Sequence, residues 1–152
     1  MQFLNTLLAL AAITSAFRIP ANAVSSDLML QFDYQYSVTC GQKNPAVNTL
    51  IDGFCNRKDI RGQLANNLTI GHPWARNGLR YGDYKVHITG PTCPADSKYI
   101  PAKYCNAQLH YLCAVSGGDK GMGAMNFGLN GCQSWQLQNL KMKCNAGGCS
   151  AW

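Results

Sequence analysis

The carboxyl and thiol groups of the chain are not spaced in any pattern typical of a catalytic or metal site. All seven acidic residues are aspartates, and none belongs to a recognisable pair for glycoside hydrolysis, which needs two carboxyl groups across the scissile bond. The chain has no G-x-S-x-G motif of a serine hydrolase. It also has no C-x-x-C motif for zinc. We therefore expect no metal and no cofactor, and we favour binding over catalysis.

Histidines are the remaining candidates for catalysis. Ribonuclease chemistry needs a general base, a general acid and a cation for the phosphate. His72, His87 and His110, together with Lys85, could supply these groups, but the glutamate base used by small microbial ribonucleases is missing. An ordinary structural role is favoured for each histidine. A secreted effector or toxin with ribonuclease-like activity is therefore the alternative function, and a structural cell-wall protein is a third.

Aromatic and amide side chains favour a sugar-binding site. Sugar rings stack on aromatic faces, and amides bind their hydroxyl groups. Trp74 lies in a loop-like stretch, where a core role and a ligand-facing role are equally open. Arg76 and Asn77 would bind hydroxyls, and the exposed strand face at Lys85 and His87 would lie nearby. We predict an extracellular or cell-surface glycan as the partner, bound by these five residues.

The first residues of the chain predict a secretory signal peptide. Residues 4–17 are almost wholly apolar and uncharged, and the small-x-small pattern at 21–23 suits signal peptidase. The apolar run is shorter than the roughly 20 residues of a membrane helix. We expect residues 1–23 to be removed and residues 24–152 to form one cysteine-rich secreted domain without a membrane span. A cut after Ala16, or a buried N-terminal helix, is the alternative.

Eight cysteines lie beyond the predicted signal peptide. An even number in a secreted chain predicts four disulfides and no free thiol, although the sequence does not reveal their pairing. Each disulfide should stabilise the fold by about 2–4 kcal/mol. The disulfide cysteines are Cys40, Cys55, Cys93, Cys105, Cys113, Cys132, Cys144 and Cys149.

Charge and glycosylation also fit an extracellular protein. The formal charge of +6 falls to +5 without Arg18, and the basic residues form no run typical of a nucleic-acid patch. Asn67 begins the sequon Asn-Leu-Thr and is the predicted N-glycosylation site.

Hydrophobic periodicity predicts an α+β fold in which helices pack on a mainly antiparallel sheet. Period-two alternation predicts strands over Leu28–Val38, Tyr84–Thr89 and Gln133–Leu140, the last with Trp135 in the core. Helical spacing predicts helices near 45–57 and 101–114. The glycine-rich residues 117–131 predict a long loop.

The order of these elements resembles that of secreted mushroom glycan-binding proteins, the lectins of the ink-cap type. The matching motifs are Phe54-Cys55, the strand Tyr84 to Ile88, the helix with Cys105, Leu109 and Cys113, then Gly117-Gly118 and Gly131-Cys132. The resemblance covers roughly residues 40–140, and the tail with Cys144 and Cys149 lies outside it. It implies an αβα sandwich that binds carbohydrate without catalysis.

Overall fold

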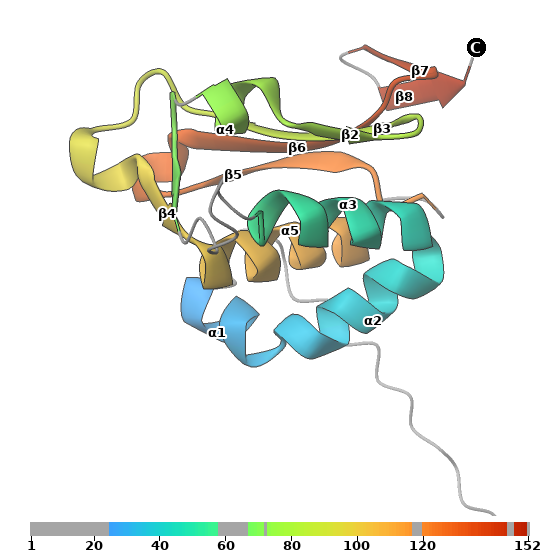
Figure 1. The fold of residues 1–152 in the computed structure, drawn as a ribbon, viewed down its shortest axis with the longest axis horizontal. Coiled ribbons are helices and arrows are strands. Elements are labelled where there is room, and N and C mark those ends of the chain that lie inside the picture. Colours follow the sequence, from blue (N-terminus) through green and yellow to red (C-terminus); the bar gives the residue numbers. More distant parts are fainter. Residues whose placement is uncertain (1–24, 58–66, 72, 117–119, 146–147, 152) are drawn as a thin grey trace, which may run out of the picture.

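The structure is a computed structural model that describes residues 25–57, 67–71, 73–116, 120–145 and 148–151 (Figure 1). The predicted signal peptide, residues 1–23, lies outside the described residues, and so do His72 and the Gly117-Gly118 pair.

A four-stranded antiparallel sheet forms the centre of the fold, with strand order β2-β3-β6-β5. Its strands are β2 (Leu79–Tyr81), β3 (Tyr84–Thr89), β5 (Gly123–Phe127) and β6 (Gln133–Asn139). The central pair, β3 and β6, places Val86 opposite Leu137 and Ile88 opposite Trp135. Strands β3 and β6 confirm two of the three strands predicted from the sequence.

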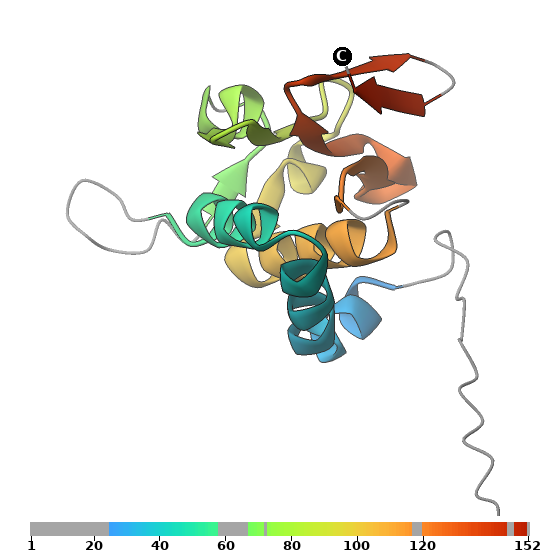
Figure 2. The same ribbon diagram turned by 90° about the vertical axis from the view of Figure 1, so that its right-hand side faces the viewer.

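Helices cover one face of this sheet in two layers. Helices α3 (Pro45–Cys55) and α5 (Ala102–Val115) pack directly on the strands. Helices α1 (Ser26–Gln31) and α2 (Asp33–Lys43) lie beyond α5 (Figures 1 and 2). The short helix α4 (Pro73–Asn77) lies on the opposite side of the sheet, against β3 (Figure 1). The arrangement confirms the predicted α+β class and the helices predicted near 45–57 and 101–114.

Smaller elements complete the described chain. Strand β1 (Asn67–Thr69) pairs with β4 (Tyr99–Pro101), and β7 (Met142–Asn145) pairs with β8 (Gly148–Ala151), both antiparallel. Two single-turn 3₁₀ helices are η2 (Ala95–Ser97) and η3 (Leu129–Gly131).

The sequence around α3 shows why a helix begins there. The Asn44 side chain caps the helix by accepting a hydrogen bond from the Val47 amide at 3.3 Å, and Pro45 occupies the first turn. Apolar side chains then recur at helical spacing and are all buried: Val47, Leu50, Ile51 and Phe54.

The predicted strand over residues 28–38 is wrong, because this segment forms the last four residues of α1 and the first six of α2. Its alternating apolar residues do not share a buried face: Tyr34 is 76% exposed and Phe32 is 38% exposed. The buried Met29 and Cys40 and the half-buried Tyr36 instead follow helical spacing. Cys40 also forms a disulfide with Cys113 of α5, so tertiary contacts on one helical face outweigh the period-two pattern.

The predicted loop over residues 117–131 is also wrong in part, since it contains β5. Glycine, alanine and asparagine are weak strand formers, which hides this strand in the sequence. Its residues nevertheless pair with β6 along its whole length, and Phe127 at its end is buried. Pairing with a central strand therefore determines the conformation here.

Three disulfides join elements distant in sequence: Cys40–Cys113, Cys55–Cys105 and Cys93–Cys132. The first two fasten α2 and α3 to α5. In the β7–β8 hairpin, the Cα atoms of Cys144 and Cys149 are register partners, but these two side chains lie outside the described residues. The predicted fourth disulfide therefore stays a prediction.

The core fills the space between the sheet and the helices. Trp135 is fully buried, its ring meets Phe127 edge-on with centroids 5.2 Å apart, and its indole N–H donates to Gln133 Oε1 at 2.9 Å. This hydrogen bond satisfies the one polar atom of a large apolar side chain. The predicted core position of Trp135 is confirmed.

Candidate functional site

The outer face of the central strands is polar. Along β3, Val86 and Ile88 are fully buried beneath the helices, whereas Lys85 and His87 alternate to the opposite face and are half-buried. Lys85 lies opposite Gln138 of β6, and His87 lies opposite Gln136. The strand face predicted at Lys85 and His87 therefore exists and continues onto β6.

Amide side chains on β6 form a hydrogen-bonded row, which we call the amide ladder (Ser134, Gln136 and Gln138). Gln138 Nε2 donates to Gln136 Oε1 at 2.9 Å, and Gln136 Nε2 donates to Ser134 Oγ at 3.2 Å. All three side chains are half-buried on the outer face. The sequence prediction missed them, although the alternation that placed Trp135 and Leu137 in the core put their neighbours on this face.

The surroundings of His87, beside this ladder, favour its neutral form. Burial lowers its pKa below the usual 6.5, and the nearby Lys85 ammonium lowers it further. Its Nδ1 atom is buried and has no hydrogen-bond partner among the described residues. Because Nδ1 is buried, a ligand at the surface does not reach this nitrogen.

A glycine lets the turn after α4 approach His87 closely. Gly78 has φ +70°, and a Cβ there would lie 1.9 Å from the Val86 carbonyl oxygen and 2.8 Å from His87 Cβ. Only glycine fits both this dihedral angle and this close contact. The turn therefore presses the end of α4 against β3.

The other predicted ligand-binding residues lie on α4, which the sequence had predicted as a loop. Ala75 is buried and anchors this helix, whereas Arg76 and Asn77 are exposed. Arg76 lines a cavity of about 310 Å³ together with Ile88 and Thr89 at the end of β3. The side chains of Trp74 and of Asn67 lie outside the described residues, so the predictions for both stay untested.

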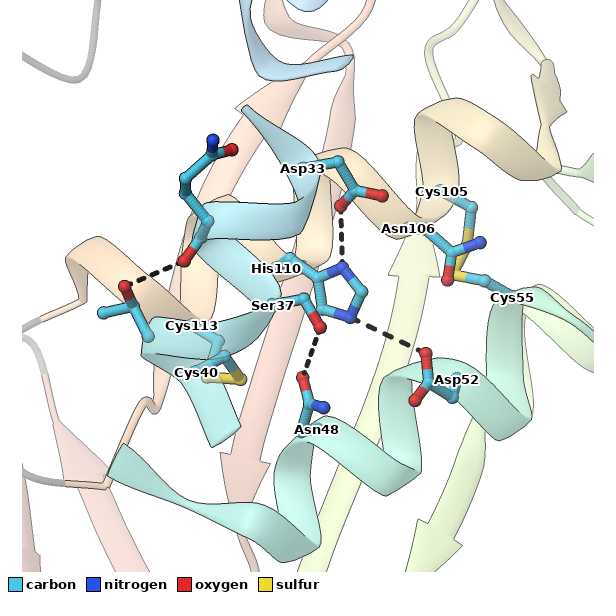
Figure 3. Close-up of polar contacts among 12 residues, drawn as sticks. Asp33, Ser37, Cys40, Asn48, Asp52, Cys55, Cys105, Asn106, His110 and Cys113 are labelled. Carbon is cyan, nitrogen blue, oxygen red and sulfur yellow. Dashed lines mark hydrogen bonds and ion pairs between the residues drawn. A yellow bond between two sulfur atoms is a disulfide. The ribbon is translucent and has the colours of Figure 1, made fainter. Parts of the chain in front are cut away.

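A second polar cluster lies among the helices, on the other side of the sheet from the amide ladder. His110 of α5 is 4% exposed, and its Nδ1 lies 2.7 Å from Asp33 Oδ1 of α2. Its Nε2 lies 3.7 Å from Asp52 Oδ1 of α3. Figure 3 shows the imidazole between the two carboxyl groups, with the hydrogen bond from Ser37 to Asn48 beside it.

The geometry of this cluster favours a structural role. An ionised carboxylate only accepts hydrogen bonds, so Nδ1 carries a hydrogen and donates it in a hydrogen bond to Asp33 Oδ1. Nε2, which a substrate would have to reach, is buried. The sequence analysis placed Asp33 in a predicted strand and linked neither aspartate to His110, and therefore missed the cluster. Among the described residues, no group of three or more side chains could hold a metal ion.

The site and the fold together define a disulfide-linked α+β protein with a polar, amide-rich outer sheet face. Comparisons with known protein families, with curated proteins and with solved structures found no match to the chain. Within the part of the chain that the structure describes, no helix is long and apolar enough to span a bilayer.

Proposed function

We propose that the chain is a secreted, non-catalytic glycan-binding protein whose site is the outer face of β3 and β6. The amide ladder beside Lys85 and His87 is the observation that carries this proposal. Its side chains offer alternating donors and acceptors, which suit the closely spaced hydroxyl groups of a sugar. The predicted signal sequence, the three disulfides among the described residues and the resemblance to the ink-cap lectins support an extracellular role.

Pre-organisation favours binding at this face. Free glutamine side chains lose rotational freedom when a ligand immobilises them, and this costs about 0.5–1.5 kcal/mol of binding free energy for each side chain. Gln136 and Gln138 already hold each other in one arrangement, so much of this loss occurs on folding. Each remains half-buried rather than covered, which leaves room for a ligand.

The same face lacks the groups for hydrolysis. Its described side chains on β3 and β6 are Lys85, His87, Thr89, Ser134, Gln136 and Gln138, and none is a carboxylate. Glycosidases need two carboxyl groups across the bond. Binding without cleavage is therefore the function that the residues support.

A glycan array with the mature secreted protein tests the proposal. We expect saturable binding by the wild type and weaker binding by Gln136→Ala, by about two- to tenfold, which corresponds to the loss of one net hydrogen bond. Gln35→Ala on the exposed surface of α2 is the matched control and should bind like the wild type. Trp74→Ala tests the predicted stacking residue separately. A wild type that binds no glycan refutes the proposal.

A further inference from the structure

A cavity between α4 and the end of β3 combines an apolar lining with two cationic side chains. Its volume is about 310 Å³, at the small end of the range for ligand sites. Pro91 is exposed in its wall, and the wall also includes Ile70 and Ile88, which are only 5% and 0% exposed. Arg76 of α4 and Lys98, which precedes β4, line the same cavity.

Both cations lack a carboxylate partner in the described part of the chain. The ion pairs found there involve His110 and Lys141, and none involves Arg76 or Lys98. The described residues that line the cavity include no carboxylate either. Two positive charges beside an apolar surface favour an anion there, and they disfavour a cation of similar size.

We propose that this cavity binds a small monocarboxylate with an apolar body. The carboxylate would accept charge-assisted hydrogen bonds from Arg76 and Lys98, and the guanidinium can bind it through two parallel bonds. The apolar body would cover the exposed Pro91 and the small part of Ile70 that reaches the surface, gaining about 25 cal/mol for each Å² removed from water. Sugars carry hydroxyl groups around the ring and match this lining less well than they match the amide ladder.

The proposal is independent of glycan binding, because it uses different side chains and a different ligand. It reassigns Arg76 from hydroxyl recognition to carboxylate recognition. Lys98 belongs to this cavity and not to the outer face of β3 and β6. Lys98→Ala therefore tests the cavity without altering the amide ladder.

Calorimetric titration of the mature protein with octanoate tests the proposal. There are three comparison ligands. Octan-1-ol lacks the negative charge, octylamine carries a positive charge instead, and glucuronate lacks the apolar body. We expect octanoate to bind best, and we expect Lys98→Ala and Arg76→Ala each to weaken it about tenfold, the effect of one charge-assisted hydrogen bond. Lys120→Ala removes the same charge from an exposed position elsewhere and should change nothing.

Filling the cavity provides a second test. Thr89 is half-buried and lines the cavity, so Thr89→Phe should abolish octanoate binding while thermal unfolding shows a folded protein. The proposal is overturned if octanoate does not bind, or if octan-1-ol or glucuronate binds as tightly. It is equally overturned if Lys98→Ala and Arg76→Ala, folded by the same criterion, bind octanoate like the wild type. Thr89 lies opposite Ser134 of the amide ladder, so Thr89→Phe is used for octanoate binding alone. The Lys98→Ala and Arg76→Ala results do not bear on the ladder, which Gln136→Ala tests.

Discussion

Replacing His110 by leucine tests whether the Asp33–His110–Asp52 cluster stabilises the fold. The substitution removes the 2.7 Å hydrogen bond to Asp33, and hydrogen bonds to charged groups are worth about 1.5–3 kcal/mol. Asp52 adds little, because its side chain is 55% exposed and lies 3.7 Å away. Leucine offsets part of this, because it still buries apolar surface and because it removes the buried, unpaired Nε2 atom. We therefore expect the free energy of unfolding to fall by about 1–2 kcal/mol.

Guanidinium or thermal unfolding of the oxidised protein measures this loss. A loss of 1–2 kcal/mol should lower the Tm by several degrees, since about 3–5 °C corresponds to each kcal/mol in a chain of this size. His110→Asn is the matched variant, because its amide nitrogen can occupy the place of Nδ1 and donate to Asp33. It should recover part of the stability. The reasoning is refuted if the leucine variant is as stable as the wild type, or if both variants lose the same amount.

Alanine variants of His110 and His87 address the alternative function, a secreted effector or toxin with ribonuclease-like activity. A buried structural histidine predicts no RNA cleavage by the wild type. RNA cleavage that is lost in His110→Ala or His87→Ala would favour the enzyme over the glycan-binding protein.

Two further predictions concern stability. His87 has a pKa below 6.5 in the folded protein, so as the pH falls through 6.5 the unfolded chain takes up the proton first and the free energy of unfolding decreases, until the folded pKa is passed. The decrease should be smaller in His87→Gln, as measured by denaturant unfolding at several pH values, and an unchanged profile would contradict it. Replacing both Cys55 and Cys105 by alanine should cost about 2–5 kcal/mol, because their disulfide joins α3 to α5. A double variant as stable as the wild type would contradict this role.

The sequence predicts elements well where local and tertiary preferences agree. Helix α3 combines the Asn44 cap, Pro45 and buried residues at helical spacing, and all three point to the same structure. Strands β3 and β6 alternate cleanly because one face meets the core and the other faces outwards. The same alternation predicted that Lys85 and His87 lie on the face of β3 away from the core, as the structure has them.

The sequence misleads where contacts distant in the chain decide the structure. Residues 28–38 alternate by type, but the disulfide at Cys40 and the packing against α5 require a helix. The cluster at His110 joins Asp33 and Asp52 from two other helices, so no local spacing reveals it. Strand β5 exists because β6 offers it a partner, which its own composition does not indicate.

An NMR titration of the isotopically labelled mature protein tests glycan binding at the amide ladder most directly. The ligand is the glycan with the strongest array signal, and the side-chain amide resonances are followed during the titration. We predict that the signals of Gln136 and Gln138 shift together and saturably. The amides of Asn56 and Asn106, which bond to each other on the helical side, should not move. Binding that shifts the helical amides and leaves the ladder unchanged would contradict the proposed site, and the absence of any bound glycan would contradict the function itself.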